Sequence, residues 1–96
     1  MSYAAKSTNN FAKALKSTRK SKGLSQEDFS QVSSRTYVST LERNIKSPTL
    51  SKVEVLAQVL GVHPLTLLTL AYLRANDTGS VNTLLGLVSE EIAELT

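Results

Sequence analysis

The sequence predicts an all-α fold, with five short helices in one domain followed by one amphipathic helix. Two observations predict it. Apolar residues recur three or four positions apart along most of the 96-residue chain, which is the spacing of one buried helix face. No stretch alternates apolar and polar residues, as a half-buried strand would. The length suits a single domain with one modest hydrophobic core.

The first two helices are short and follow capping residues. Residues 1–8 are small and polar, so we expect a mobile arm ahead of the first helix. That helix begins with Asn9 or Asn10 as its N-cap and ends at Gly23, which readily takes the left-handed conformation of a helix end. The second helix follows Ser25, and acidic residues in its first turn favour the positive end of its dipole.

A third helix is expected over residues 35–43, with one buried and one free face. A hydroxyl side chain at Ser34 can cap its start. Val38 and Leu41 form its apolar stripe, and Asn44 can end it in a left-handed conformation. This helix therefore presents a polar edge opposite its anchored side.

The fourth and fifth helices divide residues 55–73, an uncharged stretch that is long enough to span a bilayer. Gly61 supplies a stop signal and Pro64 a start signal in its middle. We therefore expect two short buried helices rather than a membrane span. The first of them begins after a cap at Thr49 or Ser51.

A last amphipathic helix is expected after a turn-forming linker at residues 76–80. The chain thus divides into an arm (1–8), a domain (9–76) and a C-terminal helix (80–96). The apolar stripe of this helix can fold onto its own domain or pair with a second copy across a two-fold axis, and we expect pairing. The stripe consists of Val81, Leu84, Leu85, Val88, Ile92 and Leu95.

Charge is unevenly distributed along the chain. Residues 1–52 hold ten basic and three acidic residues, whereas the rest hold one basic and five acidic, so the net charges are +7 and −4. The front half therefore suits a polyanion, although ordinary solvated charge gives the same counts. The chain has no cysteine, which excludes disulfides and thiolate metal sites, and its first residues contain no secretory signal. We expect a cytoplasmic protein.

The sequence does not predict an enzyme. The lone His63 lies beside Pro64 at a helix start, without an acidic or thiol neighbour in sequence, so a capping or surface role is expected for it. The sequence contains no glycine-rich phosphate loop and no cluster of metal ligands. We therefore expect no cofactor, no metal and no small-molecule ligand.

The second and third helices, joined by a tight polar turn, predict a unit whose second helix can enter the major groove of DNA. The Val38 and Leu41 stripe would anchor that helix and leave its polar edge free to meet base edges. An exposed helix with solvated polar residues is the alternative. Arg35 suits a guanine, which offers two acceptors to a guanidinium group. The candidates for base contacts are Arg35, Thr36, Ser39 and Thr40.

Five segments form a combined pattern with Arg19. They are KGLSQEDF at 22–29, SRTYV at 34–38, LERN at 41–44, SPTL at 47–50 and LGVHP at 60–64. This pattern resembles the Cro/phage-repressor (XRE-type) helix-turn-helix family over about residues 10–74, and in particular its short repressors and restriction-modification controller proteins. The resemblance implies a five-helix, lambda-repressor-like DNA-binding domain.

The resemblance also implies roles for individual residues. Gln26 matches a residue that grips a DNA phosphate at the start of the second helix, and Arg35, Thr36 and Thr40 match base-reading positions. A second match, of Arg19 and Glu42, implies a buried ion pair that ties the first helix to the recognition helix. Further contacts to the DNA backbone are assigned to Tyr37, Arg43, Asn44 and Lys46.

The chain departs from the family pattern between Phe29 and Val38. This segment is about two residues shorter than usual, and serines at 33 and 34 replace the customary turn glycine. We therefore expect the second helix to end a turn early and the recognition helix to be tilted.

Together these inferences predict a sequence-specific transcriptional regulator, with repression as the expected outcome. It would insert the helix around residues 34–43 into the major groove of double-stranded DNA, as a homodimer on a palindromic operator. Two alternatives stay open. One is an antitoxin-type module whose C-terminal helix binds a partner protein, and the other is non-specific binding through phosphate contacts alone.

Overall fold

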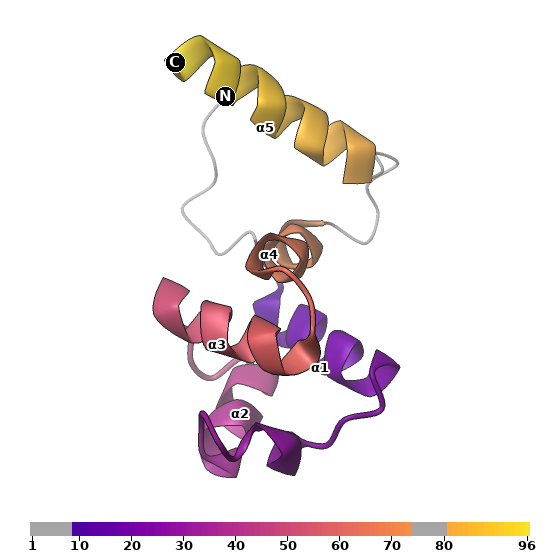
Figure 1. Ribbon diagram of the computed structural model, residues 1–96, viewed down its shortest axis with the longest axis vertical. Helices are drawn as coiled ribbons and strands as arrows, with labels where there is room; N and C mark the ends of the chain where they lie inside the picture. The colour runs from indigo at the N-terminus through magenta and orange to yellow at the C-terminus, as the bar shows by residue number, and fades with distance from the viewer. Residues whose placement is uncertain (1–8, 74–80) are drawn as a thin grey trace.

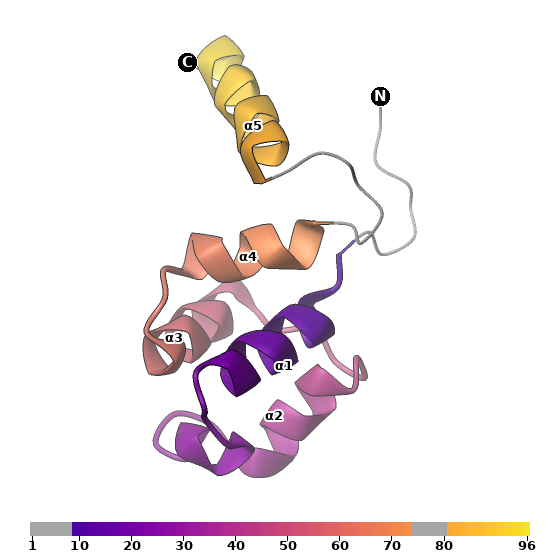
Figure 2. The same ribbon diagram turned by 90° about the vertical axis from the view of Figure 1, so that its right-hand side faces the viewer.

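The computed structural model describes residues 9–73 and 81–96, and these two ranges contain helices and no strand. The elements are α1 (Phe11–Ser21), the 3-10 helix η1 (Gln26–Phe29), α2 (Arg35–Glu42), α3 (Leu50–Leu60), α4 (Pro64–Tyr72) and α5 (Val81–Leu95). The first five pack together, and α5 lies apart from them, beyond α4 (Figures 1 and 2). The all-α prediction is confirmed, whereas the expected arm (1–8) and linker (76–80) lie outside the described residues.

Helix α1 has the two ends that its sequence predicts. The Asn10 side chain caps it by accepting a hydrogen bond from the backbone N–H of Lys13 at 3.2 Å. At the other end Gly23 has a φ of 71°, in the left-handed region. This conformation lets the Leu24 N–H donate to the Arg19 carbonyl at 3.0 Å, which satisfies one of the last carbonyls of the helix.

The second helix is a single turn of 3-10 helix rather than an α-helix. The Asp28 carboxylate accepts hydrogen bonds from the Ser25 backbone N–H (2.6 Å) and hydroxyl (3.1 Å), which fixes the start of the turn. The N–H groups of Val32 and Ser33 both donate to the Phe29 carbonyl at 2.9 Å, so the chain bends away directly after η1. The short segment before α2 leaves no room for another helical turn.

Helix α2 begins and ends on local hydrogen bonds. The Ser34 hydroxyl accepts from the Tyr37 N–H at 3.0 Å and so caps the first turn. Asn44 takes the predicted left-handed conformation, with a φ of 61°, and its N–H donates to the Leu41 carbonyl at 3.1 Å. The helix therefore closes at Glu42, one residue earlier than expected.

Residues 55–73 fall in two helices that meet at a sharp bend, as predicted. Thr49, rather than Ser51, caps α3, and Gly61 ends it with a φ of 73°. The axes of α3 and α4 then differ by 107°. Across residues 9–73 and 81–96 no single helix has the length and apolarity to cross a membrane, although α3 and α4 taken together meet those two criteria.

One hydrophobic core joins α1, η1, α2, α3 and α4. The Asn10 N–H donates to the Ala71 carbonyl at 2.6 Å, which ties the start of α1 to the end of α4. Helix α1 packs most extensively on α4 and also contacts α2, so it holds the domain together. The core consists of Phe11, Ala14, Leu15, Phe29, Val38, Leu41, Val53, Leu56, Ala57, Leu60, Leu67 and Ala71.

Candidate nucleic-acid interface

Helix α2 is anchored by its apolar stripe at the end of the molecule opposite α5 (Figure 2). Val38 and Leu41 are 0% and 1% exposed and belong to the hydrophobic core. The helix packs against α1 and η1. Because one side of α2 is fixed in this way, Arg35 and Thr36 on its other side are exposed at the surface of the molecule.

The predicted base-contact residues lie on α2 with unequal exposure. Arg35 and Thr36, in the first turn, are exposed, whereas Ser39 and Thr40 are half-buried. The Thr40 hydroxyl donates to the Tyr37 carbonyl within the same helix at 2.6 Å. The first turn of α2 therefore offers the side chains with the freest access to an external partner.

A buried ion pair fixes the other end of α2. Arg19 of α1 grips the Glu42 carboxylate with two parallel hydrogen bonds, Nε to Oε2 at 2.7 Å and Nη2 to Oε1 at 3.0 Å. Arg19 Nη1 also donates to the Leu24 carbonyl at 2.9 Å. The two side chains are only 11% and 3% exposed, so the bidentate pair ties α1, the following loop and α2 together within the core.

The network around Glu42 keeps both charges in place. Burial by itself raises the pKa of Glu42, but hydrogen bonds from Arg19 and Gln26, together with the charges of Arg19 and Lys16, lower that pKa below its ordinary value. The hydrogen bond to Glu42 raises the pKa of Arg19 against the opposing effect of burial. The pair is therefore ionised at neutral pH.

The predicted phosphate-contact residues are in two different settings. Arg43, Asn44 and Lys46 are exposed in the segment directly after α2. Gln26 and Tyr37 are half-buried instead, and Gln26 Nε2 donates to Glu42 Oε1 at 3.0 Å, so it joins η1 to α2. The structure thus places the exposed residues and the half-buried residues of this set on or next to α2.

Lys52 of α3 is a neighbour of this site that sequence reasoning did not single out. Its Nζ donates to the Val32 carbonyl at 3.2 Å and lies 5.2 Å from the centre of the Tyr37 ring. These partners are 20 and 15 positions away in sequence, so no local pattern could have indicated the contact.

Comparison with known protein families agrees with this geometry. The family described as helix-turn-helix, of the XRE or lambda-repressor type, matches residues 15–67, which is more than half of the chain. The chain belongs to the XRE-type helix-turn-helix family. It is therefore a DNA-binding regulator of this type, and the predicted resemblance is confirmed. Comparison with curated proteins and with solved structures gives no match.

Within this helix-turn-helix domain, η1 and α2 are the two helices of the motif, and residues 30–34 form the turn. His63 is the N-cap of α4, where its Nδ1 accepts from the Leu65 N–H at 2.9 Å. Among the described residues, no group of three or more His, Cys, Asp or Glu side chains could hold a metal ion. The family is one of regulatory DNA-binding domains.

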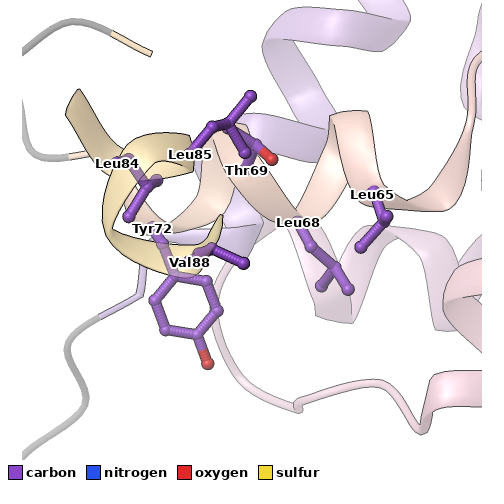
Figure 3. A pocket seen from close by; sticks show the side chains of 7 residues that line it. All are labelled: Leu65, Leu68, Thr69, Tyr72, Leu84, Leu85 and Val88. Atoms are coloured by element: carbon purple, nitrogen blue, oxygen red, sulfur yellow. The ribbon is translucent and has the colours of Figure 1, made fainter. Parts of the chain in front are cut away.

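Helix α5 lies beyond the matched segment and leaves an apolar groove against α4 (Figure 3). None of its residues is buried, and of the six predicted for dimerisation Leu84 is half-buried while the others are exposed by 40% to 85%. The groove has a volume of about 520 Å³. It is lined by Leu65, Leu68, Thr69 and Tyr72 of α4 and by Leu84, Leu85 and Val88 of α5.

Proposed function

We propose that this protein is a sequence-specific operator-binding regulator that acts as a homodimer, with repression of transcription as its outcome. The observation that carries the proposal is the anchoring of α2, whose Val38 and Leu41 are buried while Arg35 and Thr36 are exposed. A helix held on one side and polar on the other can enter the major groove. The expectation of repression rests on the resemblance of the sequence pattern to short repressors of the family.

Base reading starts at the first turn of α2. Arg35 can donate two hydrogen bonds to the major-groove acceptors of a guanine, and Thr36 can contact an adjacent base. Ser39 and Thr40 are half-buried and would meet bases only where the helix lies deepest in the groove. Discrimination at the operator therefore depends most strongly on Arg35.

Contacts to the DNA backbone surround this edge. Arg43, Asn44 and Lys46 follow α2 and are exposed, which suits direct contact with phosphates. Gln26 lies before the turn, in η1, and Tyr37 lies after it, in the first turn of α2, and each would reach a phosphate beside the base-contact residues. Because the Gln26 amide is already held by Glu42, it is oriented before DNA arrives.

Dimerisation is assigned to α5. Its apolar side is uncovered, and together with α4 it leaves a groove of about 520 Å³ that a second copy of α5 would fill. A stable interface needs about 800 Å² of surface from each partner, and exposed apolar side chains on both helices supply surface of this kind. An operator with half-sites one helical turn apart would require the two-fold axis to hold the two recognition helices about 34 Å from each other.

Selection of bound duplexes from a random pool tests the proposal, with the molecular weight determined in the same buffer. We expect a palindromic preferred sequence and a dimeric protein, and we expect a promoter that overlaps this sequence to be repressed in a reporter assay. Equal recovery of all sequences would favour non-specific phosphate binding instead, and would overturn the proposal.

A second candidate is an antitoxin-type module, in which the domain binds DNA while α5 binds a partner protein. The exposed apolar side of α5 favours this candidate as much as it favours pairing. Co-purification separates the two, because an antitoxin would come out with its partner at a fixed stoichiometry, whereas a plain repressor would come out as a dimer alone.

A further inference from the structure

We infer that Lys52 of α3 is a positioning residue that sets the orientation of α2, and with it base discrimination, without touching DNA itself. This inference rests on the proposed function, because it concerns how the same recognition helix is aimed. Lys52 lies outside the set of residues assigned above to bases and phosphates.

The Lys52 ammonium group has two partners across the helix-turn-helix motif. Nζ donates to the Val32 carbonyl at 3.2 Å, and Val32 lies in the turn between η1 and α2. The same Nζ lies 5.2 Å from the centre of the Tyr37 ring, in the first turn of α2. Within about 6 Å a cation is attracted to the face of an aromatic ring. One charge thus joins α3 to both the turn and the recognition helix.

The position of Lys52 within α3 is unfavourable for a cation unless the side chain has partners elsewhere. It is the third residue of the helix, where the positive end of the dipole disfavours a cation, and the first turn of α3 contains no acidic residue. The Val32 carbonyl and the Tyr37 ring offset this disadvantage. The contact also holds the side chain over the motif and keeps it half-buried.

Helix α2 is short and needs a constraint at each end to have one defined tilt. Its C-terminal end is fixed by the pair between Arg19 and Glu42. Its N-terminal end follows a tight turn after a single 3-10 turn. Val32 and Tyr37 there pack against the core, and Lys52 adds a polar link from this end to α3. Arg35 and Thr36, the most exposed base-contact candidates, lie beside that end. A small rotation there would move them relative to the bases.

The test compares Lys52→Met with the wild-type full chain, on the selected operator and on its single-base variants, over a range of salt concentrations. We expect discrimination between these duplexes to fall about two- to fivefold, the factor that corresponds to losing one cation–π contact. The dependence of affinity on salt should stay unchanged, because no phosphate contact is lost. Lys52→Arg should restore discrimination, since guanidinium both donates to carbonyls and stacks on rings.

Lys46→Met is the matched control, because Lys46 is an exposed lysine assigned to a phosphate. It should reduce the salt slope by about one unit and leave discrimination as it was. Tyr37→Leu provides a second route if circular dichroism shows that Lys52→Met is unfolded. It should lower discrimination as well. Where Lys52→Met folds, adding it to Tyr37→Leu should change discrimination little further.

Three results would overturn the inference. A Lys52→Met salt slope reduced by about one unit would make Lys52 a phosphate contact. Unchanged discrimination in folded Lys52→Met, or in Tyr37→Leu where that variant replaces it, would make the contact irrelevant to aim. Equal binding of the wild type to all duplexes would remove the proposed function together with this inference, and so differs from a failure of Lys52 alone.

Discussion

Glu42 is a single carboxylate that serves three elements of the domain. It accepts hydrogen bonds from Arg19 of α1 and from Gln26 of η1, and it is the last residue of α2. Both of its oxygens are used, so a neutral replacement would leave the Arg19 guanidinium buried without a counter-charge. Its ionisation is therefore linked to the stability of the motif.

The stability of the protein should fall in acid through Glu42. The folded-state pKa of Glu42 lies below its ordinary value of 4.5, so its contribution is complete above that pH and is lost as the pH falls through the folded pKa. At neutral pH we expect Glu42→Gln to lower the free energy of unfolding by about 3 kcal/mol. Urea titrations between neutral and acidic pH should show this difference shrinking below pH 4.5.

The exposed Glu54→Gln on α3 is the control for Glu42, and it should change neither the stability nor its pH dependence. A difference between wild type and Glu42→Gln that stayed constant down to low pH would contradict the assigned role of the carboxylate.

Arg35 should carry base discrimination. Arg35→Ala removes an exposed side chain without disturbing the core, so we expect it to lose about 1 to 3 kcal/mol of binding at the selected operator, and little on duplexes changed at the base that Arg35 reads. Fluorescence anisotropy with a panel of duplexes measures both quantities. An unaltered order of preference among the duplexes would show that Arg35 does not read a base.

At the scale of elements, the packing of the domain depends on the residues at which its helices end. Gly61 has a φ of 73° and separates α3 from α4, whose axes then differ by 107°. This bend lets α4 turn back and pack on both α3 and α1.

Gly61→Ala should therefore destabilise the domain by about 1 kcal/mol, because a left-handed conformation is costly for any residue with a Cβ. The added methyl group would meet no atom within 4 Å, so the cost would come from the backbone alone. Thermal unfolding measures it. Gly86→Ala in the middle of α5 is the control, where the Cβ is equally free and helicity should rise instead. Equal effects of the two substitutions would contradict the role given to Gly61.

At the scale of the whole molecule, the two ends differ in what they offer. One end presents α2 and its polar edge, and the other presents α5 with an uncovered apolar side (Figure 1). Large apolar surfaces on soluble proteins commonly mark interaction sites. DNA binding and assembly would then occur at separate ends.

Val88→Asp should convert the proposed dimer into monomers, because Val88 lines the groove between α4 and α5. Sedimentation velocity would measure the oligomeric state, and operator affinity should fall in parallel. Leu87→Asp is the matched control, since Leu87 is similarly exposed (48% against 40%) but does not line the groove. Persistence of a dimer in Val88→Asp would place the interface elsewhere.

Much of the fold could be predicted from local signals. The helix ends at Asn10, Gly23, Asn44 and Gly61 depend on side-chain caps and on left-handed conformations, which are properties of one or two residues. The 3-10 geometry of η1 could not be predicted from such signals, because it follows from the small number of residues that connect Phe29 to α2. The departure from the family pattern indicated only that this helix would end early.

The sequence by itself determined the helices, their order and their buried faces. The spacing of apolar residues and the capping of helix ends involve only a few neighbouring residues, so both can be read from the sequence. It also indicated the recognition helix and the pairing of Arg19 with Glu42, through the family pattern. Only the tertiary structure decided that Gln26 joins that pair and that Lys52 reaches Val32 and Tyr37. These contacts connect residues far apart in sequence, so they exist only once packing has fixed the distance between helices.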